Sequence, residues 1–250
     1  MSLERITSRK NPLLQHVKKL QASRAYRTSC GEFVSDGTKL LEEAVKWNAK
    51  LHTVIAADDI PLCALPEETR VVRVPADVMQ SVSQMETPQG VLSVCGLPMS
   101  PLLAFPRGGL ILEGIQDPGN LGTILRTADA LDVPVVLTEG CADPYSTKAV
   151  RASMGAVFRT PPQRTGRDAV ISYCRQNLIP LYATALTEKA VDLRSVALSD
   201  AAVVIGSEGR GISEVFLQQT ERQIIIPMSP RCESLNAAVA AAIVLWQMRR

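Results

Sequence analysis

The chain has 250 residues, of which 46% are apolar and 21% charged, and its formal net charge is +2. These values exclude a mostly disordered or fibrous chain, and the length suffices for one large domain or two modest ones. The charge is uneven, because the first thirty residues carry seven lysines and arginines against Glu4 as the single acid. Such a basic segment fits either a polyanionic partner or a solvated helix face.

The sequence gives little support for a membrane-spanning helix, a metal site or a disulfide framework. The longest apolar run, Ala237 to Trp246, has ten residues, whereas a membrane-spanning helix needs about 20. The six cysteines contain no CxxC pair, and the histidines are His16 and His52 alone. We therefore expect no membrane span, no metal site and no histidine-based acid–base chemistry, but buried reduced thiols in a cytoplasmic protein.

The first part of the sequence predicts alternating helices and strands. Residues 1–28 are predicted to be helical, and an apolar stripe predicts a helix over residues 38–48. Strands are predicted over residues 51–57, 70–74 and 90–95. Three prolines and three glycines between residues 96 and 109 indicate a linker. The predicted division is a basic N-terminal extension (1–30), a small α/β domain (31–96), a linker (97–108) and a second domain (109–250).

The second part predicts a repeated strand–helix pattern. Leu121, Ile124, Leu125 and Ala128 have the spacing of an amphipathic helix. A last helix is predicted to begin with Ser234 as its N-cap. Short apolar strands are predicted over residues 110–112, 133–137, 179–184, 202–205 and 223–226. Strands of this kind, separated by helices, predict a mostly parallel sheet that is covered on both faces.

Three polar segments each follow a predicted strand, at the position where open α/β sheets hold ligands. In the first, residues 113–126, Asn120 is placed at a helix cap and Arg126 lies further along the same helix. This arrangement suits a phosphate or carboxylate site, but taken alone it is better explained by a capping asparagine and a surface arginine.

The second segment, residues 205–211, has three glycines that allow close backbone approach to a ligand, or form a turn without one. Its acid, Glu208, would repel a phosphate and favours a hydrogen-bonding or cationic ligand. The third segment, residues 226–236, places Ser234 and Asn236 near a helix start, where they could orient a hydroxyl group or a ribose.

The three segments read N-L-G-x-x-x-R, G-x-E-G-x-G and I-P-M…S-L-N-A-A-V-A-A-A-I, in that order. Together they resemble the SpoU/TrmH family of RNA ribose 2′-O-methyltransferases, within the SPOUT superfamily, over residues 109–250. Upstream, F-V-S-D-G-T-K-L-L-E-E-A from Phe33 and T-P-Q-G-V-L from Thr87 resemble the small substrate-binding domain of the members that modify ribosomal RNA. That domain has a fold akin to some ribosomal proteins.

The resemblance implies an α/β fold whose C-terminal domain is tied in a trefoil knot, a homodimer, and S-adenosylmethionine as cofactor. It implies catalytic roles for Asn120, Arg126, Glu208, Ser234 and Asn236. The cofactor-binding residues that it implies are Thr184, Gly206, Glu208, Gly209, Ile226, Met228, Ser234 and Leu235. Because an arginine hardly loses its proton, we expect Arg126 to stabilise a developing alkoxide rather than to act as the base.

The implied activity is methylation of a ribose 2′-hydroxyl in structured RNA, with large-subunit (23S) ribosomal RNA as the expected substrate. Two alternatives keep the fold: methylation of transfer RNA, and a catalytically silent RNA-binding or ribosome-assembly protein. A nucleotide-dependent oxidoreductase is opposed by the missing GxGxxG motif. The expected RNA contacts are basic residues, namely Arg5, Arg9, Lys10, Lys18, Lys19, Lys39 and Arg151.

Overall fold

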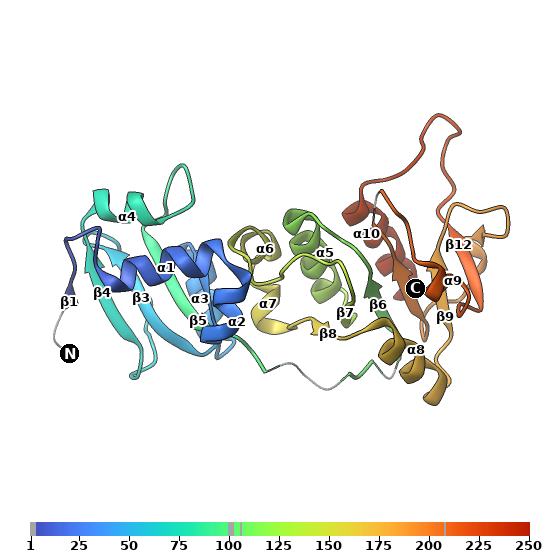
Figure 1. Ribbon diagram of the computed structural model, residues 1–250, viewed down its shortest axis with the longest axis horizontal. Coiled ribbons are helices and arrows are strands. Elements are labelled where there is room, and N and C mark those ends of the chain that lie inside the picture. Colours follow the sequence, from blue (N-terminus) through green and yellow to red (C-terminus); the bar gives the residue numbers. More distant parts are fainter. Residues whose placement is uncertain (1–3, 100–102, 106, 208) are drawn as a thin grey trace. The chain divides into compact units, whose positions relative to one another are not determined.

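The computed structural model describes residues 4–99, 103–105, 107–207 and 209–250 (Figure 1). The chain forms two compact units, each with its own sheet. The first comprises Met1–Met99 and Tyr145–Arg159, and the second comprises Ser100–Pro144 and Thr160–Arg250. The predicted α/β class is confirmed. Residues 145–159, which the sequence prediction assigned to the second domain, pack with the first unit.

The first unit contains a mixed five-stranded sheet in the order β1-β4-β3-β5-β2. Strand β5 is antiparallel to both of its neighbours, whereas β4 is parallel to both of its own. The strands are β1 (Glu4–Arg5), β2 (Glu32–Asp36), β3 (Leu51–Ala57), β4 (Arg70–Val74) and β5 (Val91–Gly96). The helices are α1 (Pro12–Ala22), α2 (Arg24–Cys30), α3 (Thr38–Lys46), α4 (Ala76–Val82), α6 (Thr147–Ser153) and α7 (Ala156–Arg159).

The basic N-terminal segment is part of this unit's core. Leu14, Val17 and Leu20 lie on one face of α1 and are fully buried, in a cluster with residues of β2, β3, β4 and β5. Asn11 caps the helix by accepting a hydrogen bond from the backbone N of Leu13. The residues expected to form an extension therefore pack against the sheet through α1, whose Lys19 is exposed.

Helices α6 and α7 cover the other side of β2. The ring of Phe33, which is 1% exposed, has its centroid 5.0 Å from that of Tyr145 and 5.9 Å from that of Phe158. Arg159 forms an ion pair with Glu43 of α3. These contacts explain why the short segment that carries α6 and α7 belongs to the first unit.

The second unit contains a seven-stranded sheet in the order β10-β12-β9-β11-β6-β7-β8, and all six neighbouring pairs are parallel. Its strands are β6 (Gly109–Leu112), β7 (Val135–Leu137), β8 (Gln163–Arg164), β9 (Leu181–Thr184), β10 (Val191–Asp192), β11 (Ala202–Ile205) and β12 (Arg222–Ile225). Its helices are α5 (Pro118–Ala130), α8 (Arg167–Gln176), α9 (Glu214–Leu217), α10 (Ala237–Met248) and the 3₁₀ helix η1 (Leu193–Ser195). The predicted mostly parallel sheet is thus confirmed.

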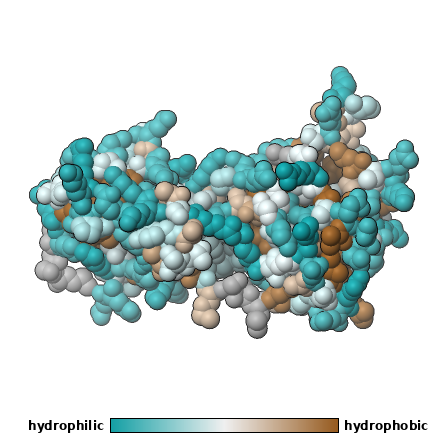
Figure 2. Space-filling view, viewed as in Figure 1, coloured by the Kyte–Doolittle hydropathy of each residue, from teal (hydrophilic) through white to brown (hydrophobic). Residues whose placement is uncertain are grey.

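The core of the second unit joins the central strands to α8 and α9. Ile111, Val136 and Val204 from the sheet pack with Val170 of α8 and Phe216 of α9, while α5 and α10 pack against each other. No helix among the described residues is long and apolar enough to cross a membrane. On the face that Figure 2 shows, hydrophobic residues reach the surface most extensively over the second unit.

Four local expectations were wrong. Within residues 1–28, which were predicted to be helical, Glu4–Arg5 form strand β1, paired with β4. Helix α5 is capped by Asp117 rather than Asn120, because an aspartate followed by Pro118 at the first helical position is a stronger start. Helix α10 is capped by Asn236 rather than Ser234. The six cysteines are free thiols, but half are exposed rather than buried, namely Cys30, Cys63 and Cys232.

The carboxyl group of Asp36, at the end of β2, lies buried in the first unit. Its Oδ2 accepts a hydrogen bond from Ser83 Oγ at 2.7 Å, whereas its Oδ1 is buried without a hydrogen-bond partner among the described residues. Burial raises the pKa of this carboxyl, against the opposing effects of the Ser83 and Gln84 hydrogen bonds and the charge of Arg151.

This raised pKa predicts a pH dependence of stability. The folded state holds the Asp36 proton more tightly than the unfolded chain does. Its contribution to the free energy of unfolding is therefore full below the ordinary carboxyl pKa and is lost as the pH rises through the raised value. The variant Asp36→Asn stays neutral, so its stability relative to the wild type should increase from pH 4 to pH 7 in urea unfolding. A difference that is constant with pH would contradict this.

Candidate active site

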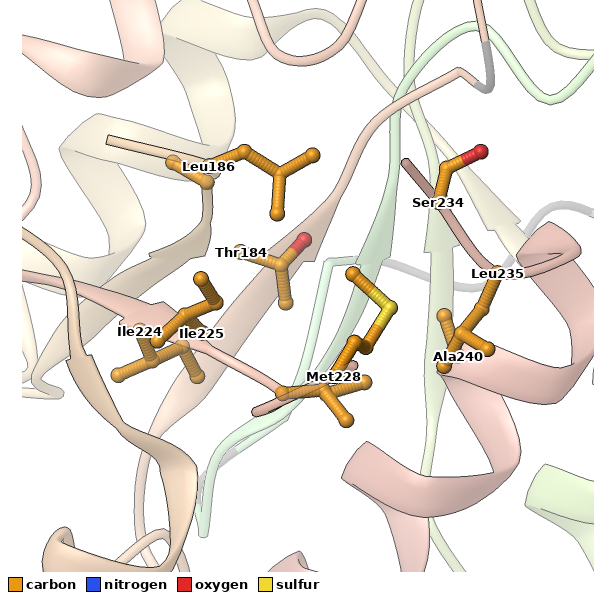
Figure 3. A pocket seen from close by; sticks show the side chains of 10 residues that line it. Thr184, Leu186, Ile224, Ile225, Met228, Ser234, Leu235 and Ala240 are labelled. Carbon is orange, nitrogen blue, oxygen red and sulfur yellow. The ribbon is translucent and has the colours of Figure 1, made fainter. Parts of the chain in front are cut away.

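An apolar cavity of about 120 Å³ lies in the second unit at the carboxyl ends of β9 and β12. Figure 3 shows the side chains of Thr184, Leu186, Met228 and Leu235 around this common space. The hydroxyl of Thr184 donates a hydrogen bond to the backbone O of Val204 at 3.1 Å, which ties the end of β9 to β11. The lining residues are Thr184, Ala185, Leu186, Ile224, Ile225, Ile226, Met228, Ser234, Leu235 and Ala240.

Five of the predicted cofactor residues line this single cavity, although 51 positions separate the first from the last. They are Thr184, Ile226, Met228, Ser234 and Leu235. Leu186, which is 64% exposed, also lines the cavity and was not predicted from the sequence. Its position just beyond a predicted strand end was the available signal, because ligands gather at such ends.

A second, polar cavity of about 340 Å³ lies beside the loops that follow β6 and β11. Asn120 and Arg210 contribute side chains to it, and α10 contributes Ala237, two residues beyond Leu235 of the first cavity. The start of α10 therefore lines both cavities. The remaining lining residues are Gly114, Ile115, Gln116, Asp117, Ser207 and Gly209.

The glycine-rich loop after β11 is closed by two backbone hydrogen bonds between Ser207 and Gly211, at 3.1 and 2.9 Å. A Cβ on Gly206 would lie 2.2 Å from the backbone O of Gly211, so only glycine fits there. Gly206 lines neither cavity, and Gly209 lines the polar one. The predicted site residue Glu208 lies outside the described residues.

Two predicted catalytic residues, 116 positions apart, are in direct contact. Asn236 Nδ2 donates a hydrogen bond to Asn120 Oδ1 at 3.1 Å. Asn236 Oδ1 accepts hydrogen bonds from the backbone N of Ala238 and of Val239, and these fix which end of the amide faces Asn120. The cap of α10 and the contact between the two asparagines are therefore made by one side chain.

The remaining predicted site residues are more dispersed. Arg126 is exposed on α5 and lines neither cavity. Among the expected RNA contacts, Arg5 pairs with Asp58 at 2.6 Å and Arg9 with Asp77 at 2.7 Å. The other five are basic side chains of the first unit, Lys10, Lys18, Lys19, Lys39 and Arg151.

Several of these five already have partners. Lys39 Nζ lies 3.5 Å from Glu42 Oε2, and Lys19 Nζ lies 5.8 Å from the centroid of the Tyr26 ring. The positive charge of Arg151 acts on the carboxyl of Asp36 and opposes part of the rise in pKa that burial causes. No group of three or more histidine, cysteine, aspartate or glutamate side chains in the described part of the chain could hold a metal ion.

Comparison with known proteins identifies the family. The model of the SpoU rRNA Methylase family matches residues 109–246. The chain belongs to this family. A second model, the MRM3-like substrate binding domain, matches residues 11–93. The family model thus covers both cavities, and the second match begins at the start of α1.

Relatives of the whole chain are RNA methyltransferases. One is the 23S rRNA (guanosine(2553)-2′-O)-methyltransferase RlmP of Bacillus subtilis, 32% identical over 99% of this chain and all of its own length. Among solved structures, a putative RNA methyltransferase of the TrmH family from Porphyromonas gingivalis is 33% identical over 94% of this chain and 96% of its own, with a TM-score of 0.85. An AdoMet-bound rRNA methyltransferase from Sinorhizobium meliloti is 29% identical over 99% and 97%, with a TM-score of 0.87.

The glycine-rich loop allows a matched pair of substitutions. The added methyl group of Gly206→Ala would collide with the backbone of Gly211, so the free energy of unfolding should fall by roughly 1–3 kcal/mol. The same change at Gly209, where a Cβ meets nothing within 4 Å, should leave stability nearly unchanged. Denaturant unfolding of both variants measures the difference, and equal effects would show that the close approach at Gly206 is unimportant.

Proposed function

We propose that this protein transfers a methyl group from S-adenosylmethionine to a ribose 2′-hydroxyl of large-subunit ribosomal RNA. The observation that carries the proposal is the meeting of an apolar cavity and the Asn120–Asn236 pair at the start of one helix, α10. Family membership and the full-length similarity to a 23S rRNA methyltransferase support it.

The residues of the apolar cavity fit the adenosyl group of this cofactor. Leu186, Met228 and Leu235 offer apolar surface to a flat base, and Ser234, which also lines the cavity, adds a hydroxyl group. When bound, the cofactor supplies a methyl group on a positively charged sulfur, which is already a good electrophile. Such a site therefore requires no metal ion. We further propose that the loops of this region form the trefoil knot implied by the resemblance.

The chain's own task is to align the ribose oxygen and to assist removal of its proton. Asn236 is held rigidly because its Oδ1 accepts two backbone hydrogen bonds, and it in turn orients Asn120. Asn120 lines the polar cavity, and together with the adjoining amide of Asn236 it can hold a ribose hydroxyl in line with the transferred methyl group. Alignment of this kind contributes roughly 7–11 kcal/mol to lowering a reaction barrier.

The experiment that tests the function is methyl transfer from labelled S-adenosylmethionine to unmodified total RNA, followed by alkaline hydrolysis. We expect label in large ribosomal RNA within dinucleotides that resist alkali, because a methylated 2′-oxygen cannot attack the neighbouring phosphate. Label confined to transfer RNA would retain the chemistry but overturn the substrate. Absence of both label and cofactor binding would favour a silent RNA-binding protein.

Arg126 is proposed to stabilise the negative charge that develops on the ribose oxygen. The substitution Arg126→Ala should then lower kcat by about 100-fold, as loss of one charge-stabilising donor does in other enzymes, while Arg126→Lys should retain part of the activity. Single-turnover rates and RNA affinity are to be measured for both. If Lys were as inactive as Ala with RNA binding intact, geometry or proton abstraction would be the role instead.

We also propose that the protein is a homodimer that meets through α5 and α10. Along α10 the side chains of Val239, Ile243 and Trp246 are 50%, 37% and 67% exposed, and they line an apolar groove of about 540 Å³ that also includes Asn120 and Asn236. A second copy seated on this groove would remove the apolar stripe from water. It would also offer a route by which Arg126, outside both cavities of its own chain, reaches a shared site.

A charge placed in this stripe should separate the dimer. The variant Trp246→Glu is expected to be a monomer by light scattering at micromolar concentration, whereas the wild type is a dimer. The control Leu178→Glu introduces the same charge at a residue that is 90% exposed outside the groove and should remain dimeric. A monomeric wild type would refute the shared site.

The lysines just before and within α1, Lys10, Lys18 and Lys19, are proposed to contact RNA phosphates. Lys10 and Lys18 form no ion pair with the described residues, unlike Arg5 and Arg9. Replacing Lys10, Lys18 and Lys19 with glutamine should reduce the salt dependence of RNA binding by roughly 0.7–0.9 in log–log slope for each phosphate that is no longer neutralised. Titrations at several salt concentrations measure this slope, and an unchanged slope would place RNA elsewhere. Deletion of the whole segment is unsuitable, because α1 is part of the core.

A further inference from the structure

One buried carboxylate lies beneath the glycine-rich loop and lines neither cavity. Glu113 directly follows β6 and is 7% exposed. Its backbone N donates a hydrogen bond to the backbone O of Ile205 at 2.9 Å, just before the loop begins. Its Oε2 accepts a hydrogen bond from the backbone N of Ser213 at 2.8 Å, just after the loop ends. The same residue therefore holds both ends of the segment Gly206–Ile212.

The hydrogen bond from the backbone N of Ser213 to Glu113 takes the place of a capping hydrogen bond from within α9. Ser213 is the N-cap of α9, but its side chain makes no capping hydrogen bond, and its Oγ is buried without a hydrogen-bond partner among the described residues. In many helices a glutamate three residues into the helix accepts the backbone N–H of the N-cap residue. Here the carboxylate comes from a strand end 100 residues earlier, so it couples the loop to the sheet.

A counter-charge accompanies the buried carboxylate. Arg167, the first residue of α8, donates from Nη1 to Glu113 Oε1 at 3.1 Å. Its Nε lies 3.2 Å from Oε2 of Glu139, whose side chain is 48% exposed. A buried carboxylate without a charged partner is strongly destabilising. Both oxygens of Glu113 are thus engaged by donors, one from the loop's end and one from Arg167.

We propose that Glu113 is a positioning residue that fixes the two ends of the glycine-rich loop, at Ile205 and Ser213, for binding S-adenosylmethionine, while Arg167 holds its second oxygen. This inference rests on the proposed function. The loop follows β11, and Thr184, which lines the apolar cavity, donates a hydrogen bond to Val204 of that strand. Glu113 is not a catalytic residue, because it acts through the backbone of the loop. Its loss should weaken cofactor binding while leaving the reacting groups in place.

The test uses Glu113→Gln with Glu139→Gln as the matched control, both in the full chain. Ser213 and Arg167 donate to different oxygens of Glu113, and glutamine has an NH2 group in place of one of them, so one of the two donors would face another donor. We expect amide hydrogen exchange of residues 206–213, without cofactor, to become about tenfold faster. We also expect the calorimetric Kd for S-adenosylmethionine to rise about tenfold, with kcat at saturating cofactor within about threefold. The Glu139 variant should stay within about twofold in each measurement.

A second variant tests whether the effects of Glu113→Gln arise from a general folding defect. Ser213→Pro removes the N–H donor together with a hydroxyl that has no hydrogen-bond partner among the described residues, and the φ of −66° at Ser213 already suits proline. It should produce the same loop exchange and the same rise in Kd. Unchanged exchange and Kd in both variants would overturn the proposal, as would faster exchange spread evenly over β6, β11 and the loop, which would indicate a general structural role. A wild type that binds no S-adenosylmethionine would instead refute the proposed function.

Discussion

The parallel pairing of β12, β9, β11 and β6 is the constraint on which the site depends. Their registers place Thr184 opposite Ile224 and Ile205 opposite Leu112, so the four strands end at one edge of the sheet. Each following loop must then leave from the same edge, where free backbone groups and exposed side chains collect. Both cavities are built from these loops and from the start of α10.

Closely spaced residues at the start of α10 line the apolar cavity and the polar cavity. Leu235 faces the apolar cavity, Ala237 the polar one, and Asn236 between them caps the helix and contacts Asn120. A side chain with three hydrogen bonds has little freedom, so the amide is oriented before any ligand arrives. Such pre-orientation favours alignment of reacting atoms, which is the main contribution that a methyl transfer from a good electrophile requires.

The sequence allowed the parallel sheet to be predicted, because short apolar strands are a local signal. The family resemblance, not the strand pattern, named five of the ten residues that line the apolar cavity, Thr184 and Leu235 among them. The first residues of α5 and α10 were not predicted correctly. Asp117 and Asn236 are the observed caps, and a nearby Asn120 or Ser234 is an equally suitable residue type, so only the hydrogen bonds of the folded chain distinguish them. The link from Glu113 to Ser213 spans 100 residues, and no periodicity reveals a contact of that length. Likewise, the basic residues of the N-terminal segment suggested an extension, although the apolar face of α1 is buried in the core of the first unit.

The most direct test of this account is a crystal structure of the full chain soaked with S-adenosylmethionine. The account predicts the adenosyl group among Leu186, Met228 and Leu235, with the sulfonium methyl directed toward the Asn120–Asn236 pair. Density for the adenosyl group in the polar cavity beside Ser207 and Arg210, or a methyl group directed away from the two asparagines, would contradict it.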